Sequence, residues 1–183
     1  MKKFRSYIVL SSVLITLFAI AANAQSSKRP LSGRALEQKV YKEIIKLPYY
    51  GVFDFINFRV NGSIVTLDGK VASLGTKSSA ASVVKRIPGV TRVVNNIDNL
   101  PPSSFDNRIR RTAYREFANS GLYRYLYENR PDVRIIVENG RITLEGYVSN
   151  NGDRNRFNIL ANGLPGVFNV TNNLIVGRDS YRS

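Results

Sequence analysis

Val65-Thr66-Leu67-Asp68-Gly69-Lys70-Val71 is the key to the fold, because the chain contains this stretch twice. It returns 77 positions later as Ile142-Thr143-Leu144-Glu145-Gly146-Tyr147-Val148. The same offset, without a gap, aligns Ile87-Pro88-Gly89-Val90 with Leu164-Pro165-Gly166-Val167 and Val93 to Asn96 with Val170 to Asn173. A match of this length indicates two copies of one domain. Two copies are too few to bury the continuous core of a solenoid, so we expect tandem domains.

The composition limits what these domains can do. The chain has 183 residues, of which 43% are hydrophobic and 22% charged, which is an ordinary globular composition. Its formal net charge of +14 favours anionic partners. It contains neither Cys nor His, so disulfides, thiol nucleophiles, imidazole bases and the usual zinc ligands are excluded. We therefore expect no metal and no cofactor.

The first 24 residues are typical of a secretory signal peptide. A basic start is followed by an apolar run from Tyr7 to Ala22 and by the cleavage pattern Ala22-Asn23-Ala24. The alternative is a retained anchor, although the run is shorter than the roughly 20 residues that a spanning helix needs. Cleavage after Ala24 predicts an exported protein, periplasmic if the source is Gram-negative. It removes three basic residues and leaves 24 basic against 13 acidic ones, a net charge of +11.

The first copy reads as a helix followed by a hairpin, a second helix and a third strand. Residues 25–34 are polar and predict a flexible lead-in. Leu36, Val40, Ile44 and Leu47 then recur at helical spacing until Pro48. Asn61-Gly62 predicts a hairpin turn. The remaining predicted elements are strands at Val52–Val60 and Ile64–Val71, a helix at Thr76–Ile87 and a strand at Val90–Ile97.

The second copy repeats this order with one insertion. Its first helix aligns at an offset of 69, which places Phe105, Ile109 and Ala113 at the core positions. Because the offset grows to 77 before the hairpin, eight extra residues fall within residues 119–132, a stretch rich in Tyr and Arg. The later predicted elements are strands at Val133–Val137 and Arg141–Val148, a helix at Asp153–Leu164 and a strand at Val167–Val176.

This order predicts the α+β class, with two tandem αββαβ domains. Each domain is expected to pack two helices on one face of a three-stranded sheet. The predicted boundaries are residues 35–100 for the first domain, residues 101–104 for a stiff Pro-Pro-Ser-Ser linker, residues 105–177 for the second domain and residues 178–183 for a polar tail.

The repeated motifs resemble those of BON domains. Each copy has a Val/Ile-x-Leu-x-Gly-x-Val strand and a Gly-Val-x-x-Val-x-Asn final strand. The matching residues are Leu67, Gly69, Val71, Gly89, Val90, Val93 and Asn95 in the first copy, and Leu144, Gly146, Val148, Gly166, Val167, Val170 and Asn172 in the second. The likeness covers about residues 35 to 100 and 104 to 177, doubled behind a signal peptide as in the OsmY-like proteins.

The resemblance implies an αββαβ fold, an envelope location and a binding role without enzymatic activity. Such binding is commonly to phospholipid membranes or to envelope proteins. The insertion within residues 119–132 departs from the family pattern. Gly69, Gly89, Gly146 and Gly166 are expected to serve the fold, because no phosphate-binding glycine pattern is present. Asp68 and Glu145 are equivalent residues of separate domains, so we do not expect them to act as a catalytic pair.

Basic residues along the first helix of each copy are the best candidates for binding. Lys39, Lys42 and Lys46 align with Arg108, Arg111 and Arg115, and every basic residue after Lys85 is Arg. Arginine forms bidentate contacts with phosphate, and tyrosine favours the headgroup level of a bilayer. A basic helix face can also serve solvation alone. The candidate lipid or partner contacts are Arg108, Arg111, Tyr114, Arg115, Tyr123, Arg124, Tyr125 and Tyr127.

Two functions from different classes fit these residues. The first is peripheral binding to anionic phospholipid membranes, in support of envelope integrity or the stress response. The second is a protein interaction module whose aromatic insertion fills a groove of an envelope partner. Nucleic-acid binding fits the charge, but export argues against it.

Overall fold

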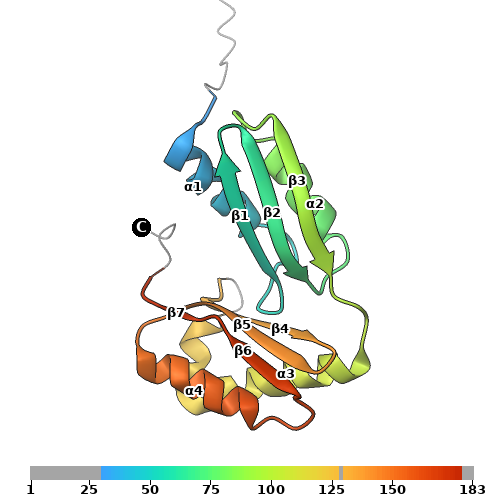
Figure 1. Ribbon diagram of the computed structural model, residues 1–183, viewed down its shortest axis with the longest axis vertical. Helices are drawn as coiled ribbons and strands as arrows, with labels where there is room; N and C mark the ends of the chain where they lie inside the picture. Colours follow the sequence, from blue (N-terminus) through green and yellow to red (C-terminus); the bar gives the residue numbers. More distant parts are fainter. Residues whose placement is uncertain (1–29, 128–129, 179–183) are drawn as a thin grey trace, which may run out of the picture.

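The computed structural model describes residues 30–127 and 130–178, which form two domains in sequence order (Figure 1). The predicted signal peptide and all but one residue of the predicted tail lie outside these ranges. The end of the predicted flexible lead-in is ordered by the fold. The amide of Leu31 donates to the carbonyl of Pro88, and the first helix already begins at Gly33.

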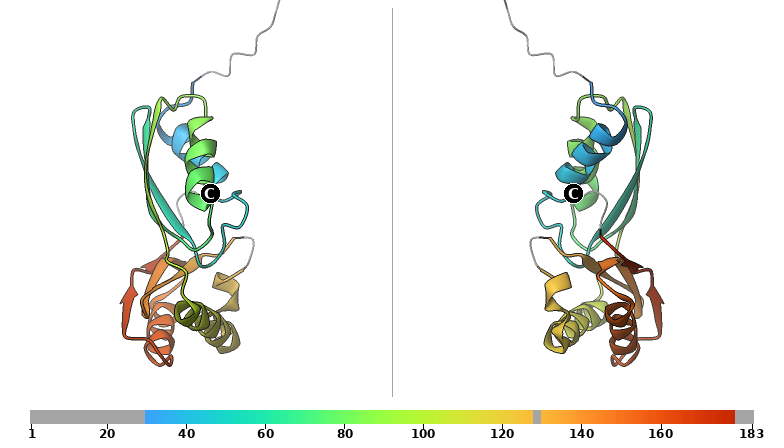
Figure 2. Two further views of the ribbon diagram at one scale, coloured as in Figure 1. Left: turned by 90° about the vertical axis from the view of Figure 1, so that its right-hand side faces the viewer. Right: turned by 90° about the vertical axis from the view of Figure 1, so that its left-hand side faces the viewer.

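The first domain has the predicted helix, hairpin, helix and strand. β1 pairs antiparallel with β2, and β3 pairs parallel with β2 on its other side. Both helices cover one face of this sheet and leave the other face open (Figure 2). The elements are α1 (Gly33–Ile44), β1 (Phe55–Asn61), β2 (Ile64–Val71), α2 (Thr76–Lys85) and β3 (Arg92–Asn99).

The second domain repeats this architecture, so the predicted α+β class with two tandem αββαβ units is confirmed. The sequence predicts one continuous last strand, but this strand is split into two pieces that both pair parallel with β5. The break lies at Asn173 and Leu174, where the Leu174 side chain is buried. The elements are α3 (Ser104–Phe117), β4 (Val133–Glu138), β5 (Arg141–Val148), α4 (Asn151–Asn162), β6 (Asn169–Asn172) and β7 (Ile175–Val176).

The motif asparagines make the same bond in both domains. The side-chain amide of Asn95 donates to the Lys77 carbonyl at 2.9 Å, and that of Asn172 donates to the Arg154 carbonyl at 3.1 Å. Each bond ties the last strand to the start of the domain's second helix. Because the donors and the acceptors are both 77 positions apart, the duplication preserves a specific contact as well as a hydrophobic pattern.

Two motif glycines allow neighbouring strands to approach each other closely. Gly69 in β2 and Gly146 in β5 have positive φ angles of 140° and 116°. A Cβ atom on Gly69 would collide with the backbone oxygen of Phe55, and one on Gly146 would collide with the backbone oxygen of Asp132. Only glycine fits both the angle and the space. The glycine of the strand motif is therefore needed by the sheet itself.

The first strand begins later than the sequence pattern predicts. Val52 to Asp54 is a turn, in which the buried Asp54 carboxylate accepts hydrogen bonds from the amides of Gly51 and Ala72. The turn carries Val52 into the hydrophobic core of the second domain. The sequence pattern predicts three further strand residues here, but the apolar side chains of this segment contact the other domain instead.

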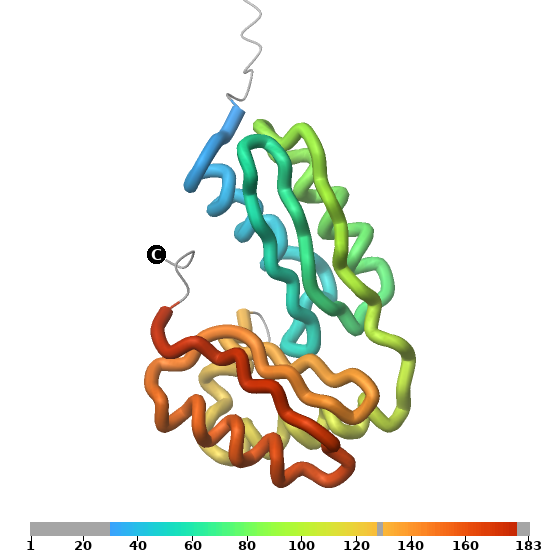
Figure 3. Tube along the Cα trace, viewed as in Figure 1, coloured from blue at the N-terminus to red at the C-terminus, as the bar shows by residue number. Residues whose placement is uncertain are grey.

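That contact joins the domains through the first strand of the second sheet. The Ile135 amide donates to the Val52 carbonyl at 2.8 Å, and the Arg134 guanidinium donates to the Gly51 carbonyl at 2.7 Å. The same guanidinium lies over the Tyr50 ring, 4.4 Å from its centroid. Figure 3 traces the loop between α1 and β1 down to these strands. The edge of β4 is thus covered by the first domain.

The Tyr/Arg-rich insertion continues α3 as irregular helix. A π-helical turn at Ala118–Leu122 is followed by a 3-10 turn at Tyr123–Tyr125. Leu122, Tyr125 and Leu126 are buried in the core of the second domain. Part of the insertion therefore fills the core of the second domain, whereas the first domain forms its own core without an insertion.

Candidate functional site

The basic stripe of α3 lies opposite its buried face. Ile109, Ala113 and Phe117 point into the core, whereas Arg108, Arg111 and Arg115 are exposed. Helical periodicity of 3.6 residues per turn separates the two sets. Figures 1 and 2 place the strands of the second domain between its helices and the first domain, so α3 and α4 form the distal layer of the molecule.

Two arginines of α4 extend this basic surface. Arg154 and Arg156 are exposed, and a guanidinium nitrogen of Arg156 lies 4.0 Å from the position of a Cβ atom on Gly121. Neither residue is among the contacts predicted from the sequence. Their exposed positions on the predicted second helix were the available signal. We call the exposed side chains of α3, α4 and the insertion the distal surface.

The carboxylates of the distal layer leave its charge strongly positive. Asp106 is buried and accepts hydrogen bonds from the amides of Asn139 and Gly140 at the β4–β5 turn. Asp153 is paired, as described below, and Glu116 remains exposed. Within the described residues, Arg108, Arg111 and Arg115 take part in none of the ion pairs. Their charge is therefore available to a ligand.

Two tyrosines of the insertion are exposed to solvent and a third is buried. Tyr123 and Tyr127 are 47% and 57% exposed, and their rings meet edge to face at 6.1 Å. Tyr125 is only 4% exposed. Its hydroxyl donates to Asp153 at 2.6 Å and accepts from the Ser149 amide at 3.0 Å. The predicted contact set therefore loses Tyr125, because burial leaves its ring unable to reach a partner.

Two further predicted contacts already have partners within the protein, although Arg124 itself is exposed. Arg124 forms an ion pair with Asp153 while lying over the Tyr125 ring at 4.8 Å. Tyr114 is half-buried and meets Phe53 of the first domain edge to face at 6.4 Å. Tyr114 is thus part of the domain interface. The predicted residues that the structure leaves exposed and without an ion pair in the described ranges are Arg108, Arg111, Arg115, Tyr123 and Tyr127.

Hydrogen bonds shift the pKa values of Asp153 and Arg124. The hydrogen bond from Tyr125 and the contacts of Arg124 lower the pKa of the Asp153 carboxyl below its ordinary value, against a smaller effect of burial. The hydrogen bonds with Tyr125 and Asp153 raise the pKa of Arg124. The cluster joins the insertion to the first turn of α4, so it holds Tyr123 and Tyr127 in place.

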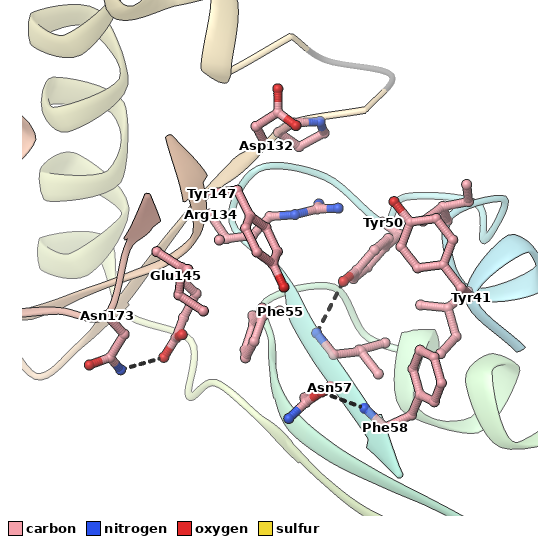
Figure 4. A pocket seen from close by; sticks show the side chains of 16 residues that line it. Tyr41, Tyr50, Phe55, Asn57, Phe58, Asp132, Arg134, Glu145, Tyr147 and Asn173 are labelled. Carbon is pink, nitrogen blue, oxygen red and sulfur yellow. Dashed lines mark hydrogen bonds between the residues drawn. The ribbon is translucent and has the colours of Figure 1, made fainter. Parts of the chain in front are cut away.

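A cleft between the domains is a second candidate site. A cavity of about 300 Å³ lies between α1, β1 and the second sheet (Figure 4). An adjoining cavity of about 390 Å³ shares Phe55, Asn57 and Glu145 with it. Burial raises the pKa of the Glu145 carboxyl, which accepts a hydrogen bond from Asn173. The cleft could not be predicted from the sequence, because its walls come from separate domains.

The cleft and the distal surface differ in charge. The carboxylates that line the cleft are Asp68, Asp132, Glu138 and Glu145, and its basic residues are Lys70, Arg134 and Arg141. Lys70 pairs with Glu138. Its charges are therefore nearly balanced. The distal surface is the part of the described chain better suited to a multiply charged anion.

Residues 30–127 and 130–178 contain neither a membrane-spanning helix nor a cluster of metal ligands. None of the helices there combines the length and hydrophobicity required to cross a bilayer. In the same ranges, acidic side chains do not gather in groups of three or more that could hold a metal ion.

The similarity of this chain to solved structures is weak. The search of curated proteins finds no match. Two solved structures of CdsD, a structural protein of the type III secretion system of Chlamydia trachomatis, were found. The C-terminal domain is 14% identical at a TM-score of 0.31 and covers 80% of this chain and 100% of that one. The other is 15% identical at a TM-score of 0.31, with coverages of 79% and 93%.

The BON domain family matches residues 32–100 and residues 106–178. The two matches cover most of the chain and coincide with the two copies of the internal repeat. The chain therefore belongs to the BON domain family and carries two BON domains in tandem.

Proposed function

We propose that this protein is a non-enzymatic, exported BON-domain protein whose second domain binds peripherally to anionic phospholipid membranes. The observation that carries the proposal is the row Arg108, Arg111 and Arg115, exposed opposite the core and without ion-pair partners in the described residues. Membership of the BON family supports it, because the resemblance implies a binding role at phospholipid membranes.

The distal surface suits a membrane in its charge and its aromatic residues. Each basic residue near an anionic surface contributes about 1 kcal/mol, so three arginines contribute about 3 kcal/mol, or roughly 100-fold in affinity. Tyr123 and Tyr127 offer exposed rings of the kind that favours the headgroup level. Guanidinium groups bind lipid phosphate in a bidentate way. The buried helix faces stay in the core while the exposed faces dock.

The predicted signal peptide supports an envelope location for this binding. Cleavage after Ala24 would release the chain outside the cytoplasm, into the periplasm of a Gram-negative source. The membrane surface would then be met from that compartment. Immunodetection of the mature chain in cell fractions, together with N-terminal sequencing, tests both the location and the cleavage site.

Vesicle co-sedimentation tests the binding. The chain from Gln25 onward is mixed with phosphatidylcholine vesicles with or without phosphatidylglycerol, at low and high salt. We expect binding to the anionic vesicles that weakens as salt rises. Changing Arg108, Arg111 and Arg115 to Glu should weaken it at least about 100-fold.

The internal repeat provides a matched control. Lys39, Lys42 and Lys46 align with the three arginines. Changing these three residues to Glu alters the net charge by the same amount on the other domain, and we expect a much smaller loss. Equal losses in the two variants, or no binding of the unmodified chain to anionic vesicles at low salt, would contradict the proposal. Retention of a specific envelope protein without vesicle binding would favour the protein-interaction alternative.

A further inference from the structure

Two phenylalanines of the second domain lie stacked and exposed at the end of α3. Phe105 is 41% exposed and Phe168, in the loop before β6, is 76% exposed. Their ring centroids are 6.2 Å apart and their planes differ by 28°. The chain enters α3 and β6 at the same end of the domain (Figure 1). Alignment with Leu36, which is buried, predicts a core position for Phe105, so this prediction is wrong.

Both rings pack closely against glycines. A Cβ atom on Gly140 would lie 2.5 Å from the Phe168 ring, and one on Gly166 would lie 3.1 Å from the Phe105 ring. The Phe168 amide also donates to the Gly140 carbonyl at 2.9 Å. The rings therefore rest on backbone that larger residues would displace. We call this pair of rings the aromatic corner.

The first domain has the same backbone at this corner but polar side chains. The Thr91 amide donates to the Ser63 carbonyl at 2.9 Å, as Phe168 does to Gly140. The two hydroxyls are hydrogen-bonded to each other at 2.7 Å. The two residues align with Phe168 and Gly140 at the offset of 77. The fold therefore does not require an aromatic ring at this position.

The segment that precedes the first helix covers this corner in the first domain. In the second domain the equivalent segment leaves the corner open. Leu31 packs on the first core, and a Cβ atom on Gly89 would collide with its backbone. The residue equivalent to Leu31 is Leu100, whose amide donates to the Val71 carbonyl of the first domain. It therefore cannot cover Gly166. The ring of Phe105 occupies that place and remains partly exposed.

We propose that Phe105 and Phe168 insert into the boundary between headgroups and acyl chains when the second domain docks on an anionic bilayer. This inference rests on the proposed membrane function. Arg108 lies one helical turn after Phe105, and Arg111 follows on the same exposed stripe. Apolar rings beside basic residues are the pattern of interfacial membrane binding. Two rings offer a contact area far smaller than the roughly 800 Å² per partner of a standard protein interface, whereas a bilayer accepts single aromatic side chains.

A tryptophan reporter tests the insertion directly. The chain contains no Trp, so Phe168→Trp introduces the only indole. With phosphatidylcholine and phosphatidylglycerol vesicles we expect its emission to shift to the blue and to be quenched by brominated acyl chains. Thr91→Trp, at the equivalent position of the first domain, is the control and should show neither change.

A second variant tests the contribution to affinity. Phe168→Thr restores the residue of the first domain at an exposed position, so the fold should be unaffected by circular dichroism. We expect about 10-fold weaker binding, with the same factor at high salt, because the lost interaction is hydrophobic.

The outcomes separate this inference from the proposed function. Vesicle binding by the Phe168→Trp variant without a shift of its indole emission overturns insertion and leaves docking through arginine intact. Unchanged affinity of the Phe168→Thr variant overturns it as well. Failure of the unmodified chain to bind anionic vesicles overturns both.

Discussion

The two domains share their internal contacts and differ in what they expose. In α1, Lys39 pairs with Glu43 at 2.7 Å, one turn further along the helix. In α3, the aligned Arg108 and its neighbours Arg111 and Arg115 take part in no ion pair within the described ranges. Losing a shared core contact costs stability in either domain, whereas an exposed position carries no such constraint. Function in this protein is therefore to be sought where the copies differ.

The domains also play unequal parts at their contact. The first domain offers the turn at residues 51–54, and the second receives it along β4. The second domain therefore buries Val52 in its own core, whereas the first domain gains no equivalent side chain among the described residues. This asymmetry makes the second domain the one that depends on its neighbour.

The largest effect is expected at the strand glycines, which the domains share. Gly69→Val and Gly146→Val each place a side chain against a neighbouring carbonyl at a positive φ angle. We expect each to cost at least about 3 kcal/mol and to unfold its own domain. Two-dimensional NMR spectra read the domains separately. Because the second domain depends on the first, Gly69→Val should also broaden signals of β4, whereas Gly146→Val should leave β1 to β3 folded. Equal damage to both domains from either variant would contradict the asymmetry.

Removing Arg134 should break the contact between the domains. The side chain is buried, donates to the Gly51 carbonyl and lies over the Tyr50 ring. Arg134→Ala should weaken the coupling by about 2 kcal/mol, because a charged hydrogen bond to a backbone carbonyl is lost. We expect one thermal transition to become two in calorimetry. Arg59→Ala is the control, because the Arg59 side chain is 70% exposed and its ion pair with Asp68 contributes little. A single unchanged transition in Arg134→Ala would mean that other contacts hold the domains together.

A smaller effect is expected at Asp153, a feature of the second domain alone. Its pKa is lowered by Tyr125 and Arg124, so its contribution to stability is present above the ordinary carboxyl pKa. That contribution is lost as the pH falls through the lowered value. Asp153→Asn should cost about 1 kcal/mol at neutral pH and flatten the acid side of the stability curve. Denaturant unfolding between about pH 2 and about pH 7 would check this, since carboxyl groups titrate within those limits. An unchanged acid limb would exclude the cluster as its cause.

The smallest effect, of opposite sign, is expected at Glu145, the counterpart of Asp68. Burial raises its folded pKa, so the folded state holds the proton longer than the unfolded state does. Stability therefore falls as the pH rises from the ordinary glutamate pKa through the raised one. Glu145→Gln should remove that fall and change stability at acid pH by less than about 0.5 kcal/mol. Unfolding curves at several pH values compare it with Asp68→Asn, the equivalent change in the first domain. The same fall in the Glu145→Gln variant as in the unmodified chain would assign it to another group.

Much of this structure was predictable because its signals are local or repeated. Helical spacing located the cores of α1 and α3, and Asn61-Gly62 located the first hairpin. The exposed arginine stripe followed from the same periodicity, since residues 108, 111 and 115 share one helix face. Each of these signals requires only the geometry of one element.

The site residues that prediction misplaced depend on distant partners. The Tyr/Arg-rich composition of its neighbours predicts a surface position for Tyr125, but Asp153 and Ser149 hold its hydroxyl inside the fold. Helical spacing predicts a core position for Phe105, but the place that Leu31 covers in the first domain is open in the second. No local pattern distinguishes these outcomes, because each depends on which chain segment happens to lie nearby.

The duplication, the order of helices and strands, the family and the charged side of α3 all follow from the amino-acid sequence. They do so because a repeat and a period are properties of the chain as written. The covering of β4, the exposure of particular tyrosines and the meeting of two phenylalanines were settled by packing. Those features require residues tens of positions apart to arrive at one point, which only the folded arrangement of the two domains can bring about.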